Sequence, residues 1–249
     1  MEIKILSYNI QSWDVTERRT KGIVELIKRH NPDVICLQEV TIFWYSFLRK
    51  QLKDIYTFTG RDRFYGNKTE RKSHFERNCV LFKKNRFKPV KCRTYWLGPD
   101  IYNPSRFEGA VLNRVFTTAI LKDFKTNKVI QFVSTHFDDR FQEIRAKQGE
   151  ILAEYAKKQE TPLVIAGDFN SEPPEGAYKS VSAILNDVGK EFKKEEITYH
   201  AYNKYPQLRI DCVFTNKKVK ALDFNIIKDE YEGLPPSDHY PLESKISIN

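Results

Sequence analysis

Short apolar runs alternate with longer mixed segments in the first part of the chain. Ile3–Tyr8 and Asp33–Leu37 have the length and composition of buried β-strands. Between them, Thr16–His30 carries apolar residues at helical spacing, and Asn31-Pro32 ends that helix. Phe43–Leu52 predicts a second helix. A strand–helix–strand–helix order is typical of an α/β fold.

The middle and the end of the chain hold apolar runs that follow one another closely. Asp123–Lys128 has turn composition and joins two of these runs as a hairpin. Gln142–Lys158 has the spacing of an amphipathic helix. The pattern predicts two mixed β-sheets packed face to face with helices outside, in a single domain over residues 1–249. The strands predicted here are Cys79–Phe82, Phe87–Tyr95, Val111–Leu121, Val129–Thr135, Leu163–Ala166, Ile210–Phe214, Phe224–Ile227 and Tyr240–Ile248.

The charge balance favours an anionic partner. The chain has 42 Lys and Arg against 33 Asp and Glu, a net charge of +9. Such a surface attracts nucleic acid, although many basic proteins bind none. The N-terminus has no secretory pattern, and no apolar run reaches the roughly 20 residues that span a bilayer. We therefore expect an intracellular, cytoplasmic protein with no membrane partner and no obligate protein partner.

The cysteines and two loop-like segments say less about function than the charge does. The four cysteines show no CxxC spacing, and Cys36, Cys79 and Cys212 lie in apolar runs. This pattern predicts free buried thiols and argues against a structural zinc site. Tyr65–Phe75 and Gly98–Gly109 have loop composition, and we expect both to face a substrate.

Polar residues suited to metal and phosphate chemistry follow five of the predicted strands. Strand ends meet at one edge of a sheet, so residues far apart in the sequence can share a pocket there. Each segment by itself is a weak signal, whereas the five in this order are a strong one. They are Ser7-Tyr8-Asn9, Leu37-Gln38-Glu39, Ser134–Asp138, Gly167–Asn170 and Ser237-Asp238-His239.

Glu39 and the Asp168/Asn170 pair carry most of the expected chemistry. A lone Glu at a strand end is more often structural, but Glu39 is the best single candidate to anchor Mg²⁺, which takes few protein oxygen ligands. Asp168 and Asn170 alternate along one strand and so share a face. A carboxylate beside an amide suits water activation and stabilisation of a phosphate oxygen. An Asx turn before Pro173 is the structural alternative.

Two histidines also end apolar strands next to acidic residues. His239 adjoins Asp238, and His136 comes two residues before Asp138. Asp211 is a second carboxylate that can orient His239. Imidazolium stabilises phosphate charge, or the ring works as an acid or base when a carboxylate sets its tautomer. Either histidine alone has a structural interpretation as well.

Together these segments resemble the endonuclease/exonuclease/phosphatase superfamily, over nearly the whole chain from Ser7 to Pro241. The resemblance implies a four-layered α/β sandwich of two packed mixed β-sheets flanked by helices. It also implies a metal-dependent phosphoester hydrolase whose site lies at one edge of the paired sheets. The residues that it assigns are Glu39 and Asn9 to the metal, Asp168 to water activation, Asn170 to a phosphate oxygen, His239 and His136 to the phosphate, Asp211 to orienting His239, and Asp238 to supporting the metal or the water.

Two positions depart from the family pattern. Tyr8 stands where a Trp is common, and Gln11 stands where some members have a carboxylate, which leaves a second metal position open. Arg114, Asn78 and Arg145 are further candidates to reach the phosphate.

The resemblance and the charge together predict a nuclease-like phosphodiesterase that uses Mg²⁺, with Mn²⁺ as a possible substitute. Water is expected to attack a nucleic-acid phosphate in line, with metal assistance. The alternatives within the hydrolases are a phosphorylated small molecule, a lipid headgroup or a tyrosyl-linked DNA end. A catalytically silent nucleic-acid-binding domain is the alternative of another class.

Overall fold

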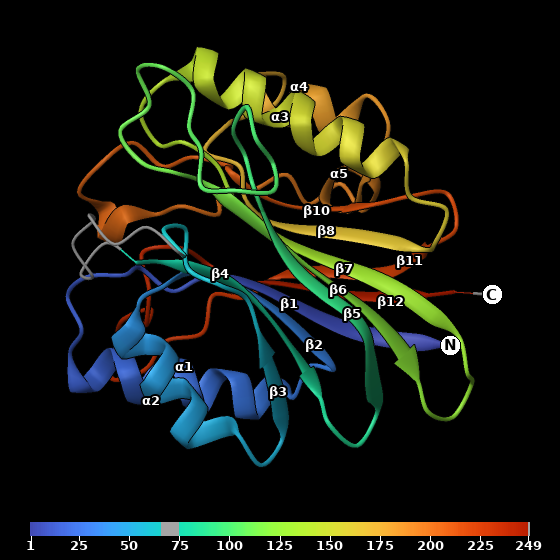
Figure 1. The fold of residues 1–249 in the computed structure, drawn as a ribbon. Helices are drawn as coiled ribbons and strands as arrows, with labels where there is room; N and C mark the ends of the chain where they lie inside the picture. The colour runs from blue at the N-terminus through green and yellow to red at the C-terminus, as the bar shows by residue number, and fades with distance from the viewer. Residues whose placement is uncertain (66–74, 249) are drawn as a thin grey trace.

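The computed structural model describes residues 1–65 and 75–248 (Figure 1). Apart from its two end residues, the predicted loop Tyr65–Phe75 lies outside the described residues. The predicted loop Gly98–Gly109 is irregular, as expected. The helices are α1 (Glu17–His30), α2 (Ile42–Leu52), α3 (Gln142–Lys157), α4 (Gly176–Ser182) and α5 (Val188–Glu191), with a 3₁₀ turn at Ala201–Asn203.

Within the described residues the strands form two six-stranded sheets, with the orders β11-β12-β1-β2-β4-β3 and β5-β6-β7-β8-β10-β9. The pairs β1/β2 and β7/β8 are parallel, and the other pairs are antiparallel. The strands are β1 (Glu2–Asn9), β2 (Val34–Val40), β3 (Tyr56–Thr59), β4 (Arg77–Lys83), β5 (Phe87–Trp96), β6 (Val115–Asp123), β7 (Val129–His136), β8 (Leu163–Asp168), β9 (Asn186–Asp187), β10 (Asp211–Thr215), β11 (Lys220–Ile226) and β12 (Leu242–Ser247).

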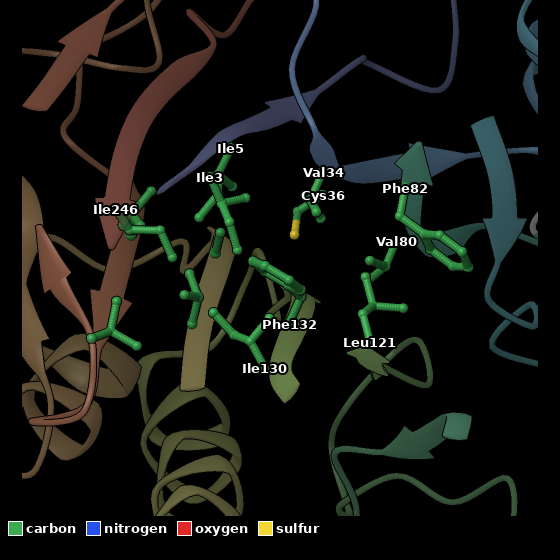
Figure 2. Packing of buried hydrophobic residues seen from close by; sticks show 14 of the residues in the cluster. Ile3, Ile5, Val34, Cys36, Val80, Phe82, Leu121, Ile130, Phe132 and Ile246 are labelled. Carbon is green, nitrogen blue, oxygen red and sulfur yellow. The ribbon is translucent and has the colours of Figure 1, made fainter. Parts of the chain in front are cut away.

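The sheets and helices stack in four layers, as predicted. Helices α1 and α2 cover the outer face of one sheet, and α3 and α4 cover the outer face of the other (Figure 1). A buried cluster fills the space between the sheets, where Ile5 and Phe82 of the first sheet and Phe132 of the second contribute side chains (Figure 2). Two further clusters lie under the helices, one in each outer layer. Burial of this apolar surface is the main force that holds the layers together.

Local signals account for the helix boundaries. The Thr16 side chain caps α1 by accepting a hydrogen bond from the Arg19 N–H, and Asn31 ends the helix in the left-handed conformation at φ 47°. Thr41 caps α2 in the same way, through the Trp44 N–H. Cys36, Cys79 and Cys212 are buried free thiols, as predicted.

The predicted strand Val111–Leu121 begins too early. Strand β6 starts at Val115, because its partner β5 ends at Trp96, which lies opposite Val115. Residues 111–114 therefore have no ladder partner, and the Leu97 N–H bonds to the Arg114 carbonyl instead. The short elements β3, β9, α4 and α5 have no counterpart among the predicted elements.

Candidate active site

The strand register places three candidate residues in one row. His136 on β7 pairs with Asp168 on β8, and Asp168 pairs with Asp211 on β10. On the facing sheet, Asn9 ends β1 opposite Gln38 of β2, so Glu39 follows directly. This edge of the sheets lies away from the chain termini (Figure 1). The predicted meeting of strand ends therefore takes place.

Asn9 joins the two sheets at this edge. Its Nδ2 donates to Glu39 Oε1 at 3.1 Å and to Asp168 Oδ2 at 2.9 Å. Glu39 Oε2 accepts a second hydrogen bond, from the Ser12 N–H at 2.7 Å. Asn9 and Asp168 are buried, whereas Glu39 is partly exposed. One amide thus ties the expected metal anchor to the expected water-activating carboxylate.

His239 lies between two carboxylates. Its Nδ1 is 2.8 Å from Asp211 Oδ2, and its Nε2 is 3.8 Å from Asp168 Oδ2. Burial disfavours the imidazolium, but Asp211 and Asp168 outweigh burial and raise the pKa of His239 to about 10. His239 is therefore a cation at neutral pH.

Asp168 has an unusual acidity for a carboxyl group. Burial and the charge of Asp211 raise the pKa of Asp168 to about 7, although His239 opposes the shift. The Asn170 N–H donates to Asp168 Oδ1 at 2.8 Å, so each carboxylate oxygen of Asp168 has a donor. A fixed carboxyl group that titrates near neutral pH has the properties of a general base.

His136 is held in the neutral form. Its Nε2 lies 3.4 Å from Asp168 Oδ2, and Arg114 Nη1 lies 3.2 Å from its Nδ1. Burial and the Arg114 charge lower the pKa of His136 well below its usual range. Arg114 is itself buried and donates to Asp139 Oδ1 at 2.7 Å. Arg114 thus brings a second cation to the Asp168 side of the site.

Three residues at this edge adopt left-handed backbone angles that non-glycine residues rarely occupy. They are Gln11 at φ 54°, Glu39 at φ 60° and Asn170 at φ 45°. Strained backbone of this kind concentrates at functional sites, where surrounding contacts hold it. For Asn170 those contacts include its N–H to Asp168 and its Nδ2 to the Phe137 carbonyl at 3.1 Å.

The other predicted residues differ in how closely they join this cluster. Asp238 Oδ2 accepts from Gln11 Nε2 at 3.0 Å, and Ser237 Oγ donates to the Asn9 carbonyl at 2.7 Å. Arg145 donates to the Asp138 carbonyl. Asn78 is buried and donates to the Val115 carbonyl at 2.6 Å, so this bond links β4 to β6 and not to the carboxylates.

The structure adds residues that the sequence did not indicate. The Tyr199 ring lies 4.8 Å from the His239 ring, centroid to centroid. Glu76 forms a 2.8 Å ion pair with buried Arg63, and burial and the Glu39 charge raise the pKa of Glu76. Neither Tyr199 nor Glu76 ends an apolar strand, the signal that identified Asn9, Glu39 and His136.

The oxygen groups around Glu39 fit a hard divalent cation. Gln11 Oε1 is buried and has no hydrogen-bond partner among the described residues, a costly state that a cation would relieve. Two carboxylates lie close to Gln11. Asp238 accepts a hydrogen bond from the Gln11 side-chain amide, and Glu39 accepts one from the N–H of the next residue, Ser12. Asp168, Asp211 and His239 form another compact ligand set. His239 and Asp211 already pair with each other there, and protonated His239 repels a cation.

A comparison with known proteins identifies the family. The model of the endonuclease/exonuclease/phosphatase family matches residues 6–239. The chain belongs to this family. Its members include hydrolases of phosphoester bonds, which agrees with the enzyme class expected from the sequence. The described residues contain no helix long and apolar enough to cross a membrane.

Individual relatives of this family member are distant in sequence. A probable exoribonuclease subunit Ccr4 of Enterocytozoon bieneusi is 24% identical, over 95% of this chain and 60% of that protein. An endonuclease/exonuclease/phosphatase of Bacteroides vulgatus has the same fold, with a TM-score of 0.88 and 24% identity over the whole of both chains. A mannosyl-6-phosphatase of Bacteroides thetaiotaomicron has a TM-score of 0.86 and 20% identity, covering 99% and 100% of the chains. The predicted fold class is confirmed.

Proposed function

We propose that this chain is a Mg²⁺-dependent phosphodiesterase that hydrolyses nucleic acid, with Mn²⁺ as a possible substitute. The observation that carries the proposal is the Asn9 amide, which holds Glu39 and Asp168 at one point between the two sheets. A metal-assisted hydrolase needs a cation and a base close to the same phosphate. This site provides an oxygen-rich position beside a carboxylate that titrates near neutrality.

Glu39 is the proposed anchor for the metal, with Asn9 as a second ligand and Asp238 supporting the same side. Asn9 Oδ1 accepts from the Gln11 N–H at 3.0 Å, and the buried Gln11 Oε1 has no partner among the described residues. When bound, a divalent cation polarises the phosphate and neutralises charge on the leaving oxygen. The roles of the protein's own residues follow from their protonation states.

Asp168 accepts the proton of the attacking water. Asn9 and the Asn170 N–H orient its two carboxylate oxygens, so the carboxylate does not need to reorganise as the proton arrives. Its pKa near 7 leaves a substantial ionised fraction at neutral pH. The Asn170 side chain is proposed to donate to a non-bridging phosphate oxygen.

Three further groups are proposed to stabilise the negative charge of the phosphate. The His239 imidazolium, fixed by Asp211, offers its Nε2–H. Neutral His136 offers a hydrogen bond but no charge, and the Arg114 guanidinium beside it supplies a positive charge. Preorganised donors of this kind stabilise negative charge that develops in the transition state. Asn78 and Arg145 remain candidates for more distant phosphate contacts.

Net charge and the named relative favour nucleic acid over the other substrates. A charge of +9 attracts a polyanion, and the relative from Enterocytozoon bieneusi is named as an exoribonuclease. The shared fold of a mannosyl-6-phosphatase keeps a phosphorylated small molecule as the runner-up. A lipid headgroup, a tyrosyl-linked DNA end or a silent binding domain are the remaining alternatives.

The test is hydrolysis of end-labelled single- and double-stranded DNA and RNA, with Mg²⁺ or with EDTA. Wild type is compared with Asp168→Asn and with Asp54→Asn, an exposed carboxylate in the turn that follows α2. We expect cleavage that requires both the metal and Asp168 and that Asp54→Asn retains. If the folded protein cleaves no nucleic acid but releases phosphate from sugar phosphates, its substrate is a phosphorylated small molecule.

A further inference from the structure

Trp13 is a large apolar side chain left open to solvent beside the site. It is 73% exposed, whereas Trp44 and Trp96 are 0% and 4% exposed. These are the three tryptophans of the chain. A single exposed Trp needs no explanation on an ordinary surface, but this one follows Gln11 and Ser12, which contact Asp238 and Glu39.

The backbone that carries Trp13 is held in place by a buried arginine. Arg19 is 1% exposed and donates to the carbonyls of Ile10, Gln11, Trp13 and Asp14. It also donates to the Pro236 carbonyl at 2.8 Å, one residue before the Ser237-Asp238-His239 segment. The guanidinium thus binds the segments that follow β1 and precede β12. Trp13 is thus exposed on a backbone segment that these hydrogen bonds hold, which lowers the entropy lost when a ligand packs on it.

Trp13 is within reach of the proposed metal anchor. The Ser12 N–H lies 2.7 Å from Glu39 Oε2, so the Trp13 Cα is at most about 8 Å from that carboxylate. Three and four residues after Glu39 in the sequence, Ile42 and Phe43 begin α2, and each is 51% exposed.

We propose that Trp13 is the surface on which a nucleobase next to the scissile phosphate stacks. The proposal rests on the nuclease function proposed above and names the part of the substrate that this site recognises. An indole presents a flat π face that any base can cover. The net charge of +9 favours a polyanionic strand of such bases over an isolated sugar phosphate.

The fluorescence of Trp13 can be used to detect a ligand that contacts it, because the other two tryptophans are buried. We would titrate the Asp168→Asn protein with an oligodeoxyadenylate and follow Trp fluorescence. An abasic tetrahydrofuran phosphodiester of equal length and mannose 6-phosphate serve as comparison probes. We expect quenching by the oligodeoxyadenylate alone. Trp13→Phe in the same background should lose this signal, and Phe124→Ala, an exposed aromatic in the β6–β7 turn, should keep it.

Kinetics provide the second measurement. Base–aromatic stacking is worth about 1–3 kcal/mol per base, so Trp13→Ala should lower kcat/KM on base-bearing strands about tenfold. Trp13→Phe should restore most of that loss. Neither variant should change kcat/KM on a substrate that is abasic at the scissile position.

The two proposals fail in different ways. Quenching by the oligodeoxyadenylate without any hydrolysis supports the Trp13 contact and rejects the nuclease. Hydrolysis without quenching, or an equal kcat/KM loss on abasic and base-bearing strands, rejects the Trp13 contact and leaves the nuclease standing. Quenching by mannose 6-phosphate overturns the nucleobase in favour of a sugar.

Discussion

Asp168 and Asp211 lie directly opposite each other on the antiparallel strands β8 and β10. Two buried carboxyl groups at paired positions disfavour each other's ionisation, and the charge of Asp211 helps to raise the pKa of Asp168 to about 7. Asp211 also contacts His239 at 2.8 Å and is the main favourable cause of its pKa near 10. Asp211 thus raises the pKa of both the proposed base, Asp168, and the cationic His239.

The pH dependence of activity follows from these two groups. Asp168 must be ionised, so kcat/KM should rise with pH through about 7, and His239 must be protonated, so kcat/KM should fall through about 10. Asp211→Asn removes a charge that raises both pKa values. Both limbs should therefore move to lower pH, the alkaline one by about 1–3 pH units.

A pH profile of kcat/KM with saturating Mg²⁺ measures these limbs. Asp223→Asn, a carboxylate on β11 outside the cluster, is the matched control and should leave the profile unchanged. An alkaline limb that stays in place in Asp211→Asn would contradict the role of Asp211.

Asp168→Asn should remove turnover without removing binding. The amide cannot accept the proton of water, so kcat should fall by about a thousandfold or more, while affinity for a labelled oligonucleotide changes little. Binding by gel shift and single-turnover hydrolysis are measured on the same protein. The affinity should also weaken as salt rises. Turnover near the wild-type rate would remove Asp168 from the mechanism.

Glu39→Gln should affect the metal first. Loss of a ligand charge should raise the Mg²⁺ concentration for half-maximal activity about tenfold or more. A second readout needs no activity: Mg²⁺ should raise the Tm of wild type and of the exposed control Glu150→Gln, but raise the Tm of Glu39→Gln less. Identical metal titrations of all three proteins would reject Glu39 as the anchor.

Gly167→Ala should destabilise the β7/β8 pairing that positions Asp168. A Cβ at Gly167 would lie 2.0 Å from the Thr135 carbonyl oxygen, a backbone atom that cannot move aside alone. We expect a loss of about 2–4 kcal/mol in the free energy of unfolding. Gly233→Ala, where a Cβ meets no atom within 4 Å, should lose about 1 kcal/mol from its positive φ. Equal losses in urea unfolding would contradict the steric argument.

Local signals explain why parts of the fold were predictable. Thr16 and Asn31 cap α1 with short-range hydrogen bonds that their side chains and conformations favour in any context. The strand ends that carry Asn9, Glu39 and Asp168 were visible as polar residues after apolar runs. Helix α4 was not, because seven residues hold little periodic signal and pack through a tertiary contact, where Ala177 lies against Gly149.

Other parts depended on partners distant in the sequence. Arg19 stands in the charged run Glu17–Lys21, yet five backbone carbonyls from two segments accept hydrogen bonds from its buried guanidinium. Gln11 was a departure from the family pattern, whereas the structure shows it bound to Asp238. Tyr199 and Glu76 lie in segments that show neither apolar periodicity nor a polar residue after an apolar run.

The sequence by itself determined the layered α/β class, the family and the residues that end the core strands, because apolar periodicity and strand-end chemistry are local properties of the chain. The tertiary structure decided which of those residues meet and in what protonation state. The row His136–Asp168–Asp211 arises from the register of three strands, and the pKa values of Asp168 and His239 arise from burial and from charges brought together by that register. Register and burial depend on contacts between distant segments, which no local pattern encodes.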